Sequence, residues 1–202
     1  MKELLIGTTN HSKIEFYRQA LRDYDFQIVL PNQYPAIINV PEDLFDIRGN
    51  SVKKATTFAQ ITNVITLSDD TGIFIPALNY EPGVAVRRWA GNLPETVSDE
   101  DWIRYFLEKI SSLRDDELEC YKHQVITVST PGIKHSSIDI ITKGRVLNDV
   151  QSPVYHKGGP FSAFFYLDEF GKTEANLTEE EMDMHTQEVK GKVLILMRQL
   201  VT

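Results

Sequence analysis

Cysteine is almost absent from this chain. Cys120 is the only one among 202 residues. An intrachain disulfide is therefore excluded, and there is no cluster of thiols that could bind zinc. The sequence also has no apolar run near the roughly 18 residues that a membrane-spanning helix needs. Residues 1–3 lead straight into a short apolar run, which is not typical of a secretory signal. We therefore expect a cytoplasmic protein with no membrane partner.

Positive charge is also scarce. Lys and Arg number 21 against 29 Asp and Glu, for a net charge of −8. This balance argues against a general nucleic-acid surface, but a small anionic substrate would need only a local basic pocket. A glycine-rich phosphate loop is missing too, because Gly171-Lys172-Thr173 lacks the earlier glycine of that motif. The length fits a single domain, residues 1–202, built of two lobes.

The hydrophobic pattern indicates an α/β protein. Short apolar runs predict strands, and apolar residues at helical spacing predict helices. The segment from Pro31 to Pro41 is expected to be a loop because three prolines interrupt it. The predicted strands are 3–6, 26–30, 64–67, 73–75, 121–130, 134–142 and 161–167, and the predicted helices are 11–24, 50–63, 98–110 and 178–200. We expect a two-lobed mixed β-sheet flanked by helices, with a central cleft for a ligand.

Two adjacent carboxylates interrupt the apolar pattern at Asp69-Asp70. They follow one predicted strand, 64–67, and precede another, 73–75, so we expect them in a turn. Carboxylates between buried strands are costly unless positive charge meets them. Mg²⁺ would suit the position, since it binds one or two carboxylates together with substrate phosphates. The alternative is a polar turn that faces water, with Gly72 supplying the bend.

A candidate phosphate site lies at the first strand-to-helix junction. The small polar loop 7–10 precedes the predicted helix, so free backbone N–H groups and the positive end of the helix dipole would meet there. Lys13 in the first turn could reach an anion, as could Lys53 and Lys54 near the start of a later helix. The alternatives are an ordinary N-cap by Asn10 or Ser12 and lysines that are simply solvated.

Five short motifs, in this order, resemble those of the inosine triphosphate pyrophosphatase family. That family hydrolyses non-canonical purine nucleoside triphosphates to monophosphates. The five motifs are Thr8-Thr9-Asn10-His11-Ser12-Lys13, Val40-Pro41-Glu42, Asn50 through Lys54-Ala55, Asp69-Asp70-Thr71-Gly72, and Pro82-Gly83 through Arg88-Trp89-Ala90-Gly91. Each motif is weak alone, whereas their order and spacing together are fairly specific. The resemblance spans nearly the whole chain.

The resemblance implies a site for Mg²⁺ and a triphosphate. Glu42 and Asp69 would help to hold the metal, and Asp70 would deprotonate the water that attacks the α-phosphorus. The substrate-binding residues implied are Thr8, Asn10, Lys13, Lys54, Thr71, Gly72 and Arg88. Family members are commonly homodimers, so a homodimer is expected here. Trp89 and Trp102 could serve an interface or belong to the core.

The last third departs from the family pattern. The aspartate of the family's Gly-Phe-Gly-Tyr-Asp-Pro segment is replaced by Ser162. A lysine, a histidine and an arginine on the last helix are replaced by Glu181, Thr186 and Gln187. Because these groups hold the purine base in the family, we expect poor selectivity among bases.

Two alternatives to a standard family enzyme follow from these departures. One is a catalytically impaired relative that binds a nucleotide without turnover. The other is a pyrophosphatase with an altered substrate that does not select purines. A structural subunit without a ligand is the least compatible with the motifs.

Overall fold

The computed structural model describes residues 2–34, 40–114, 117–132, 134–150 and 153–201. The chain divides into two compact units. Unit 1 consists of Met1–Asp70, Gln124–Ile140 and His185–Thr202, and unit 2 consists of Thr71–His123 and Ile141–Met184. None of the helices within the described ranges has the length and apolar character needed to cross a membrane.

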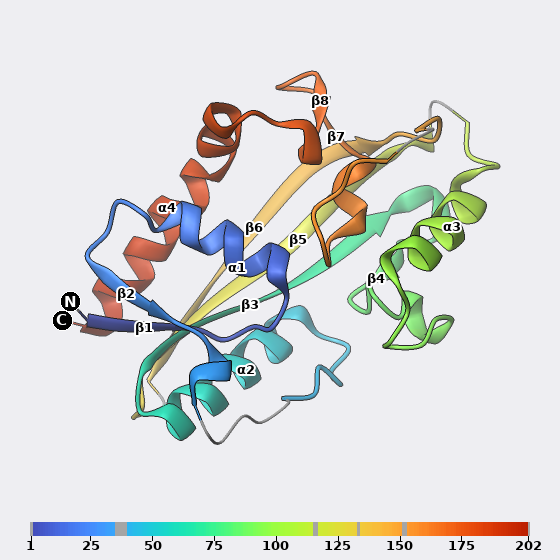
Figure 1. Ribbon diagram of the computed structural model, residues 1–202. Coiled ribbons are helices and arrows are strands. Elements are labelled where there is room, and N and C mark those ends of the chain that lie inside the picture. Colours follow the sequence, from blue (N-terminus) through green and yellow to red (C-terminus); the bar gives the residue numbers. More distant parts are fainter. Residues whose placement is uncertain (1, 35–39, 115–116, 133, 151–152, 202) are drawn as a thin grey trace. The chain divides into compact units, whose positions relative to one another are not determined.

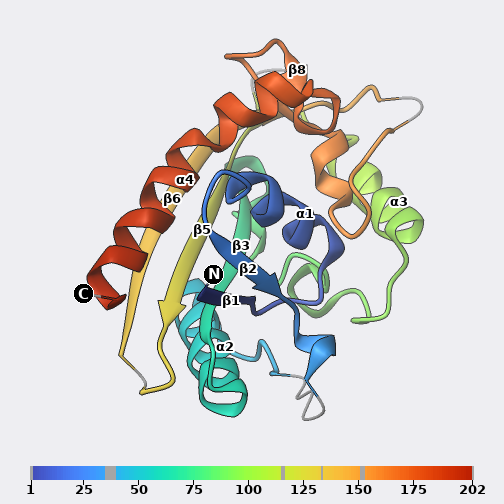
Figure 2. The ribbon, with the colours of Figure 1, turned by 60° about the vertical axis from the view of Figure 1, so that its left-hand side comes forward.

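Unit 1 contains a mixed sheet with strand order β2-β1-β3-β5-β6 (Figures 1 and 2). Strand β1 is parallel to both neighbours, with Leu4 opposite Ile28 on one side and Ile65 on the other. The strands of this sheet are β1 (Lys2–Ile6), β2 (Phe26–Val29), β3 (Ile65–Ile75), β5 (Glu119–Ser129) and β6 (His135–Val146). Parallel strands need helical crossovers, and these crossovers position the helices of the site.

Helices cover both faces of the unit 1 sheet (Figure 2). Leu4 and Ile6 pack with α1 (His11–Ala20) and α4 (Glu179–Val201), whereas Leu5 faces α2 (Ile47–Thr62). This alternation is the period of two that a strand imposes on its side chains. Successive residues of the central strand β3 therefore project to opposite faces of the sheet, one toward α1 and the other toward α2.

The predicted break between residues 67 and 73 is wrong. Strand β3 runs without interruption from Ile65 to Ile75, and Asp69 and Asp70 lie inside it. Both carboxylates are buried, at 1% and 5% relative exposure. The prediction placed the pair in a turn between two strands, whether a cation or water met the carboxylates. Lysines and amides meet them inside unit 1, so the strand can continue.

Unit 2 is built around an aromatic core. Trp89 is fully buried and Trp102 is 1% exposed, with their rings 5.9 Å apart. Trp102 also stacks on Phe106 at 5.1 Å. Both tryptophans are therefore core residues of unit 2. Its elements beyond the shared strands are β4 (Glu81–Gly83), α3 (Asp99–Ile110), β7 (Phe165–Leu167) and β8 (Lys172–Thr173). Strand β4 pairs with β3, and β7 lies between β6 and β8.

Several predicted boundaries need correction. The helix expected from residue 50 begins at Ile47, because Asp46 caps it through the backbone N–H groups of Arg48 and Gly49. The strand expected over 161–167 begins only at Phe165, after a short 3-10 helix. Part of the loop expected over 31–41 falls on residues 35–39, which lie outside the described residues. Short 3-10 helices within the described ranges include Pro31–Gln33, Pro76–Leu78, Trp89–Gly91, Pro160–Ala163 and Glu174–Asn176.

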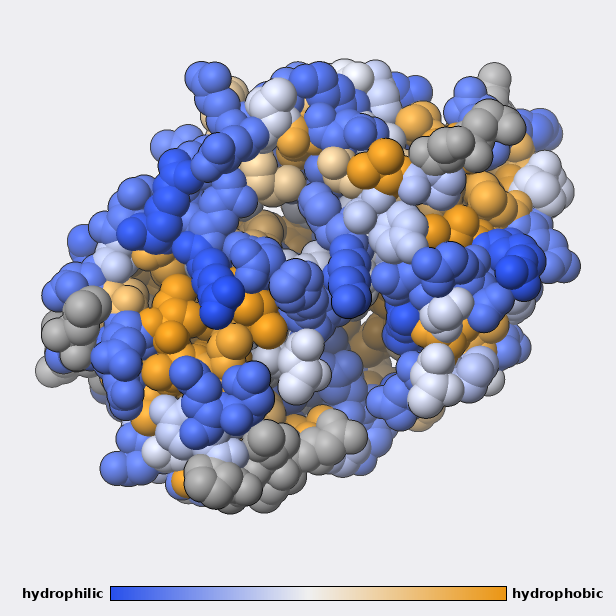
Figure 3. Space-filling view, in the orientation of Figure 1, coloured by the Kyte–Doolittle hydropathy of each residue, from blue (hydrophilic) through white to orange (hydrophobic). Residues whose placement is uncertain are grey.

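Partly buried hydrophobic side chains lie along the edge strand of unit 1. Phe26 and Ile28 of β2 pack against the core that contains Tyr17 and Leu21. Figure 3 shows hydrophobic surface over this part of unit 1. Their position accounts for the apolar run of β2, because one side of each residue contacts the core while the other meets the surface.

Two glycines give opposite predictions for replacement by alanine. A Cβ at Gly144 would lie 2.6 Å from the carbonyl oxygen of Tyr166 and 2.7 Å from the ring of Phe165, whereas nothing lies within 4 Å of one at Gly191 in α4. We expect Gly144→Ala to destabilise the fold by about 1–3 kcal/mol through overpacking. Gly191→Ala should stabilise it by about 0.5–1 kcal/mol through helix propensity. Urea unfolding of both variants measures the difference, and equal midpoints would contradict the packing described around Gly144.

Candidate active site

The first side of the site is the junction between β1 and α1. Asn10 caps the helix, since its Oδ1 accepts from the backbone N–H of Lys13 at 3.3 Å. The backbone N–H of Asn10 donates to Thr8 Oγ1 at 3.1 Å. The sequence left open a plain N-cap with a solvated lysine. The cap is present, but Lys13 is not merely solvated, because its ammonium lies 3.2 Å from Asp69 Oδ1.

Asp69 lies on the α1 face of the sheet. Besides the ion pair with Lys13, its Oδ2 accepts a hydrogen bond from Gln124 Nε2 at 2.9 Å. Burial alone would raise the pKa of Asp69, but Lys13, Lys54 and Gln124 together outweigh it and leave the pKa below its ordinary value. Asp69 is thus held ionised at neutral pH.

Asp70 lies on the opposite face, beside α2. Its Oδ2 accepts from Asn50 Nδ2 at 3.0 Å, and its Oδ1 lies 4.0 Å from the ammonium of Lys54. Burial raises the pKa of Asp70, and the charge of Glu42 raises it further, while Lys13, Lys54 and Asn50 oppose the change without cancelling it. The alternation of the strand therefore gives two neighbouring aspartates opposite pKa shifts. Such a divergence within a carboxylate pair is the usual basis of separate chemical roles.

Lys54 connects three parts of unit 1. It is 5% exposed, and its ammonium contacts a Glu42 carboxylate oxygen and the backbone oxygen of Asp69, besides lying near Asp70. The neighbouring Lys53 bonds the Pro41 carbonyl oxygen at 3.0 Å and Asp43 at 2.7 Å. Both lysines thus hold the loop that carries Glu42 against α2, and Lys54 also faces the aspartates.

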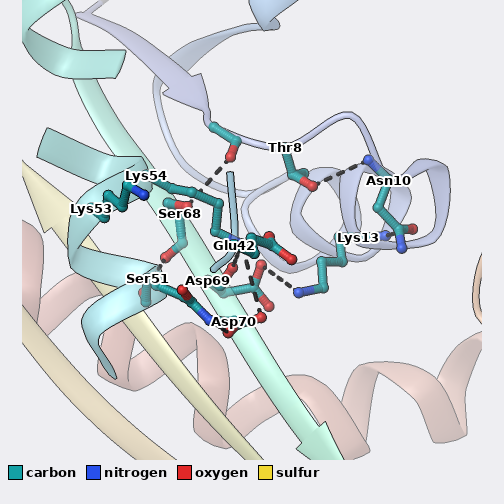
Figure 4. Close-up of polar contacts among 12 residues, drawn as sticks. Thr8, Asn10, Lys13, Glu42, Ser51, Lys53, Lys54, Ser68, Asp69 and Asp70 are labelled. Carbon is teal, nitrogen blue, oxygen red and sulfur yellow. Dashed lines mark hydrogen bonds and ion pairs between the residues drawn. The ribbon is translucent and has the colours of Figure 1, made fainter. Parts of the chain in front are cut away.

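Figure 4 shows Glu42, Asp69 and Asp70 with Lys13 and Lys54 gathered around one position. Burial alone would lower the pKa of Lys13, but the negative charges of Asp69, Asp70 and Glu42 together outweigh it, so the pKa is raised. All three predicted acidic residues therefore act on the same ammonium. The groups come from α1, the 42–46 loop and β3, which are far apart in the sequence and are brought together by the fold.

The remaining predicted residues lie in unit 2. Thr71 and Gly72 continue β3 directly after the aspartates. Arg88 precedes a 3-10 helix, and its backbone carbonyl oxygen accepts from the backbone N–H groups of Gly91 and Leu93, both at 2.9 Å. Their roles toward a substrate stay predictions.

Two contacting residues had not been identified as site residues from sequence. Asn50 is 2% exposed and holds both Asp70 and the loop, where it bonds the backbone N–H and carbonyl oxygen of Leu44 at 3.1 and 3.0 Å. Gln124 binds Asp69 from β5. Polar amides within a helix and a largely apolar strand were available signals, but nothing in the sequence said which carboxylate each would meet.

The oxygen donors suit a hard cation such as Mg²⁺. Within the described ranges, no group of three or more His, Cys, Asp or Glu residues is arranged to hold a metal by itself. Mg²⁺ in proteins is commonly held by one or two carboxylates, with phosphate oxygens and water as its other ligands. Glu42 and Asp69 are the donors expected for it, and the lysines provide positive charge nearby.

Comparison with known proteins places the chain among relatives of one family. The Ham1 family model matches residues 4–190. A dITP/XTP pyrophosphatase of Desulfotalea psychrophila is 28% identical over 95% of this chain and 81% of its own length. Another of that name, from Streptococcus thermophilus, is 29% identical over 88% of this chain, which spans only about half (53%) of that protein.

The fold is also found among solved structures. A HAM1 protein from Coxiella burnetii superposes with a TM-score of 0.78 at 22% identity, covering 98% of this chain and 100% of that one. Both have a mixed sheet flanked by helices, as the hydrophobic pattern predicted. With a family model matching most of its length, this chain belongs to the Ham1 family.

Proposed function

We propose that this protein is a Mg²⁺-dependent nucleoside triphosphate pyrophosphatase, which hydrolyses a triphosphate to a monophosphate and pyrophosphate. The main support is the pairing of Lys13 with Asp69 and of Lys54 with Glu42 and Asp70. Both ammonium groups are flexible point charges, so each can exchange a carboxylate for a phosphate oxygen. The names of the relatives, dITP/XTP pyrophosphatase, point to the same reaction.

Asp70 is the proposed general base. Asn50 fixes one of its oxygens at 3.0 Å, and burial raises its pKa toward the range in which a carboxylate can accept a proton usefully. A water held by Asp70 would lose a proton to it and attack the α-phosphorus. The bond between the α-phosphorus and the bridging oxygen would then break, and pyrophosphate would leave.

The reaction also requires that the negative charge of the polyphosphate be neutralised. We assign this neutralisation to Lys13 and Lys54, together with the start of α1 beyond Thr8 and Asn10. Mg²⁺ bound at Glu42 and Asp69 would supply further stabilisation of charge on the phosphate oxygens. Thr71, Gly72 and Arg88 are proposed as additional substrate contacts. A cytoplasmic homodimer formed by a single domain over residues 1–202 is proposed from the resemblance.

The test is a panel of nucleoside triphosphates assayed for pyrophosphate release with and without Mg²⁺. We expect release from at least one purine nucleotide, and its loss when EDTA removes the metal.

A second candidate, a nucleotide binder without turnover, is favoured by the engagement of Ser162 in a turn, where it donates to the carbonyl oxygen of Gly159 at 2.7 Å. Calorimetry on the same panel separates the two, because binding of Mg²⁺ and nucleotide without pyrophosphate release would favour the binder.

A further inference from the structure

Gln124 joins β5 to the first aspartate of the site. Its Nε2 lies 2.9 Å from Asp69 Oδ2 and 3.1 Å from the hydroxyl oxygen of Tyr17. A glutamine amide nitrogen carries two hydrogens, so it can donate to both acceptors at once. These contacts lie within unit 1 and join residues that are 107 and 55 positions apart in sequence.

Tyr17 closes a ring of three polar groups. It projects from α1 and is fully buried. Because its oxygen accepts from Gln124, its own proton is available to Asp69. Burial, then the charge of Asp69 and a hydrogen bond to it, raise the pKa of Tyr17 well above its ordinary value. Tyr17 thus supports Gln124 from α1 through a hydrogen bond of 3.1 Å.

The ring leaves the two oxygens of Asp69 in different surroundings. Oδ2 is engaged by Gln124, whereas Oδ1 lies 3.2 Å from the ammonium of Lys13, whose charge also interacts with Asp70 and Glu42. We propose that Gln124, supported by Tyr17, is a positioning residue that orients Asp69 so that Oδ1 is presented to the cation and polyphosphate. This inference rests on the function proposed above and adds a residue to which no role has been assigned.

A positioning role differs measurably from a purely structural one. Partners that hydrogen-bond a metal-binding carboxylate typically contribute 10–100-fold to metal affinity or activity. A residue that only filled space between α1 and β5 would change stability and leave the metal requirement as it was. Metal affinity, measured apart from turnover, is therefore the informative quantity.

The variant Gln124→Met removes the amide while keeping a side chain of similar volume. Its matched control is Gln27→Met on β2, where the glutamine is exposed. Calorimetry would follow Mg²⁺ binding in the presence of an α,β-imido analogue of inosine triphosphate. We expect Gln124→Met to raise the Mg²⁺ dissociation constant about tenfold and the control to match wild type. A dissociation constant within twofold of wild type for Gln124→Met would overturn the proposal.

Tyr17→Phe provides a second route, because it keeps the ring and removes only the hydroxyl. We expect it to weaken Mg²⁺ binding about threefold, in the same direction, and unchanged affinity in this variant would count against the proposal. The two proposals can fail separately. A wild-type protein that binds Mg²⁺ and the analogue but releases no pyrophosphate from nucleotides contradicts the proposed function, while the dissociation constants still decide the role of Gln124.

Discussion

Asp70→Asn should lower kcat for pyrophosphate release by about 10²–10⁴-fold, the usual contribution of a general base. An asparagine keeps the size of Asp70 and can still accept from Asn50, whose Nδ2 lies 3.0 Å from Oδ2. It cannot take a proton from water. The substitution therefore removes the proposed chemistry while preserving most of the local contacts. KM should change less than kcat, because the lysines that meet the phosphates remain.

The control for this variant is Asp23→Asn, at a surface aspartate of unit 1 whose side chain is 70% exposed. Its kcat should equal that of wild type. Circular dichroism and thermal unfolding would show that Asp70→Asn retains the fold. Turnover by Asp70→Asn equal to wild type would remove Asp70 from the mechanism.

Selectivity among bases should be nearly lost. Values of kcat/KM for inosine, xanthosine, adenosine and guanosine triphosphates should agree within about tenfold, whereas a site that hydrogen-bonds its base can discriminate by about 10⁴-fold. The reason lies in unit 2. Ser162 accepts from the backbone N–H of His156 at 3.0 Å and donates to Gly159, so it is committed to its own turn.

Glu181 is similarly engaged at the start of α4. It accepts from the backbone N–H of Thr178 at 2.8 Å and pairs with Lys172 at 2.8 and 2.9 Å. With these partners, Glu181 serves the helix cap. It does not replace the lysine that, by the resemblance, would hold the purine base at this position. Competition assays with equimolar mixtures of the four nucleotides measure the ratios directly. A preference of a thousandfold or more for inosine triphosphate would contradict this account of the base site.

The sequence predicted the alternation of strands and helices well because apolar periodicity sets it. Local capping signals also helped: the Oγ of Ser98 accepts from the backbone N–H of Asp101 at 3.0 Å, where the expected helix starts. The continuous path of β3 was not predictable in the same way. A buried Asp-Asp pair is compatible with a strand only when Lys13, Lys54 and Asn50 arrive from other elements.

The same limit applies to the candidate site. Motif order drew attention to Glu42, Asp69, Asp70 and both lysines, but the hydrophobic pattern placed the two aspartates in one shared turn. Their projection to opposite faces of a strand, and the resulting opposite pKa shifts, follow from backbone geometry that the motif does not carry. Gln124 was missed because its partner is 55 residues away.

Hydrolysis in ¹⁸O-labelled water, followed by mass spectrometry of both products, tests the central claim most directly. If Asp70 activates a water that attacks the α-phosphorus, the nucleoside monophosphate should carry one ¹⁸O and the pyrophosphate none, with no products when Mg²⁺ is removed. Label in pyrophosphate or in orthophosphate would place the attack on another phosphorus and contradict the mechanism.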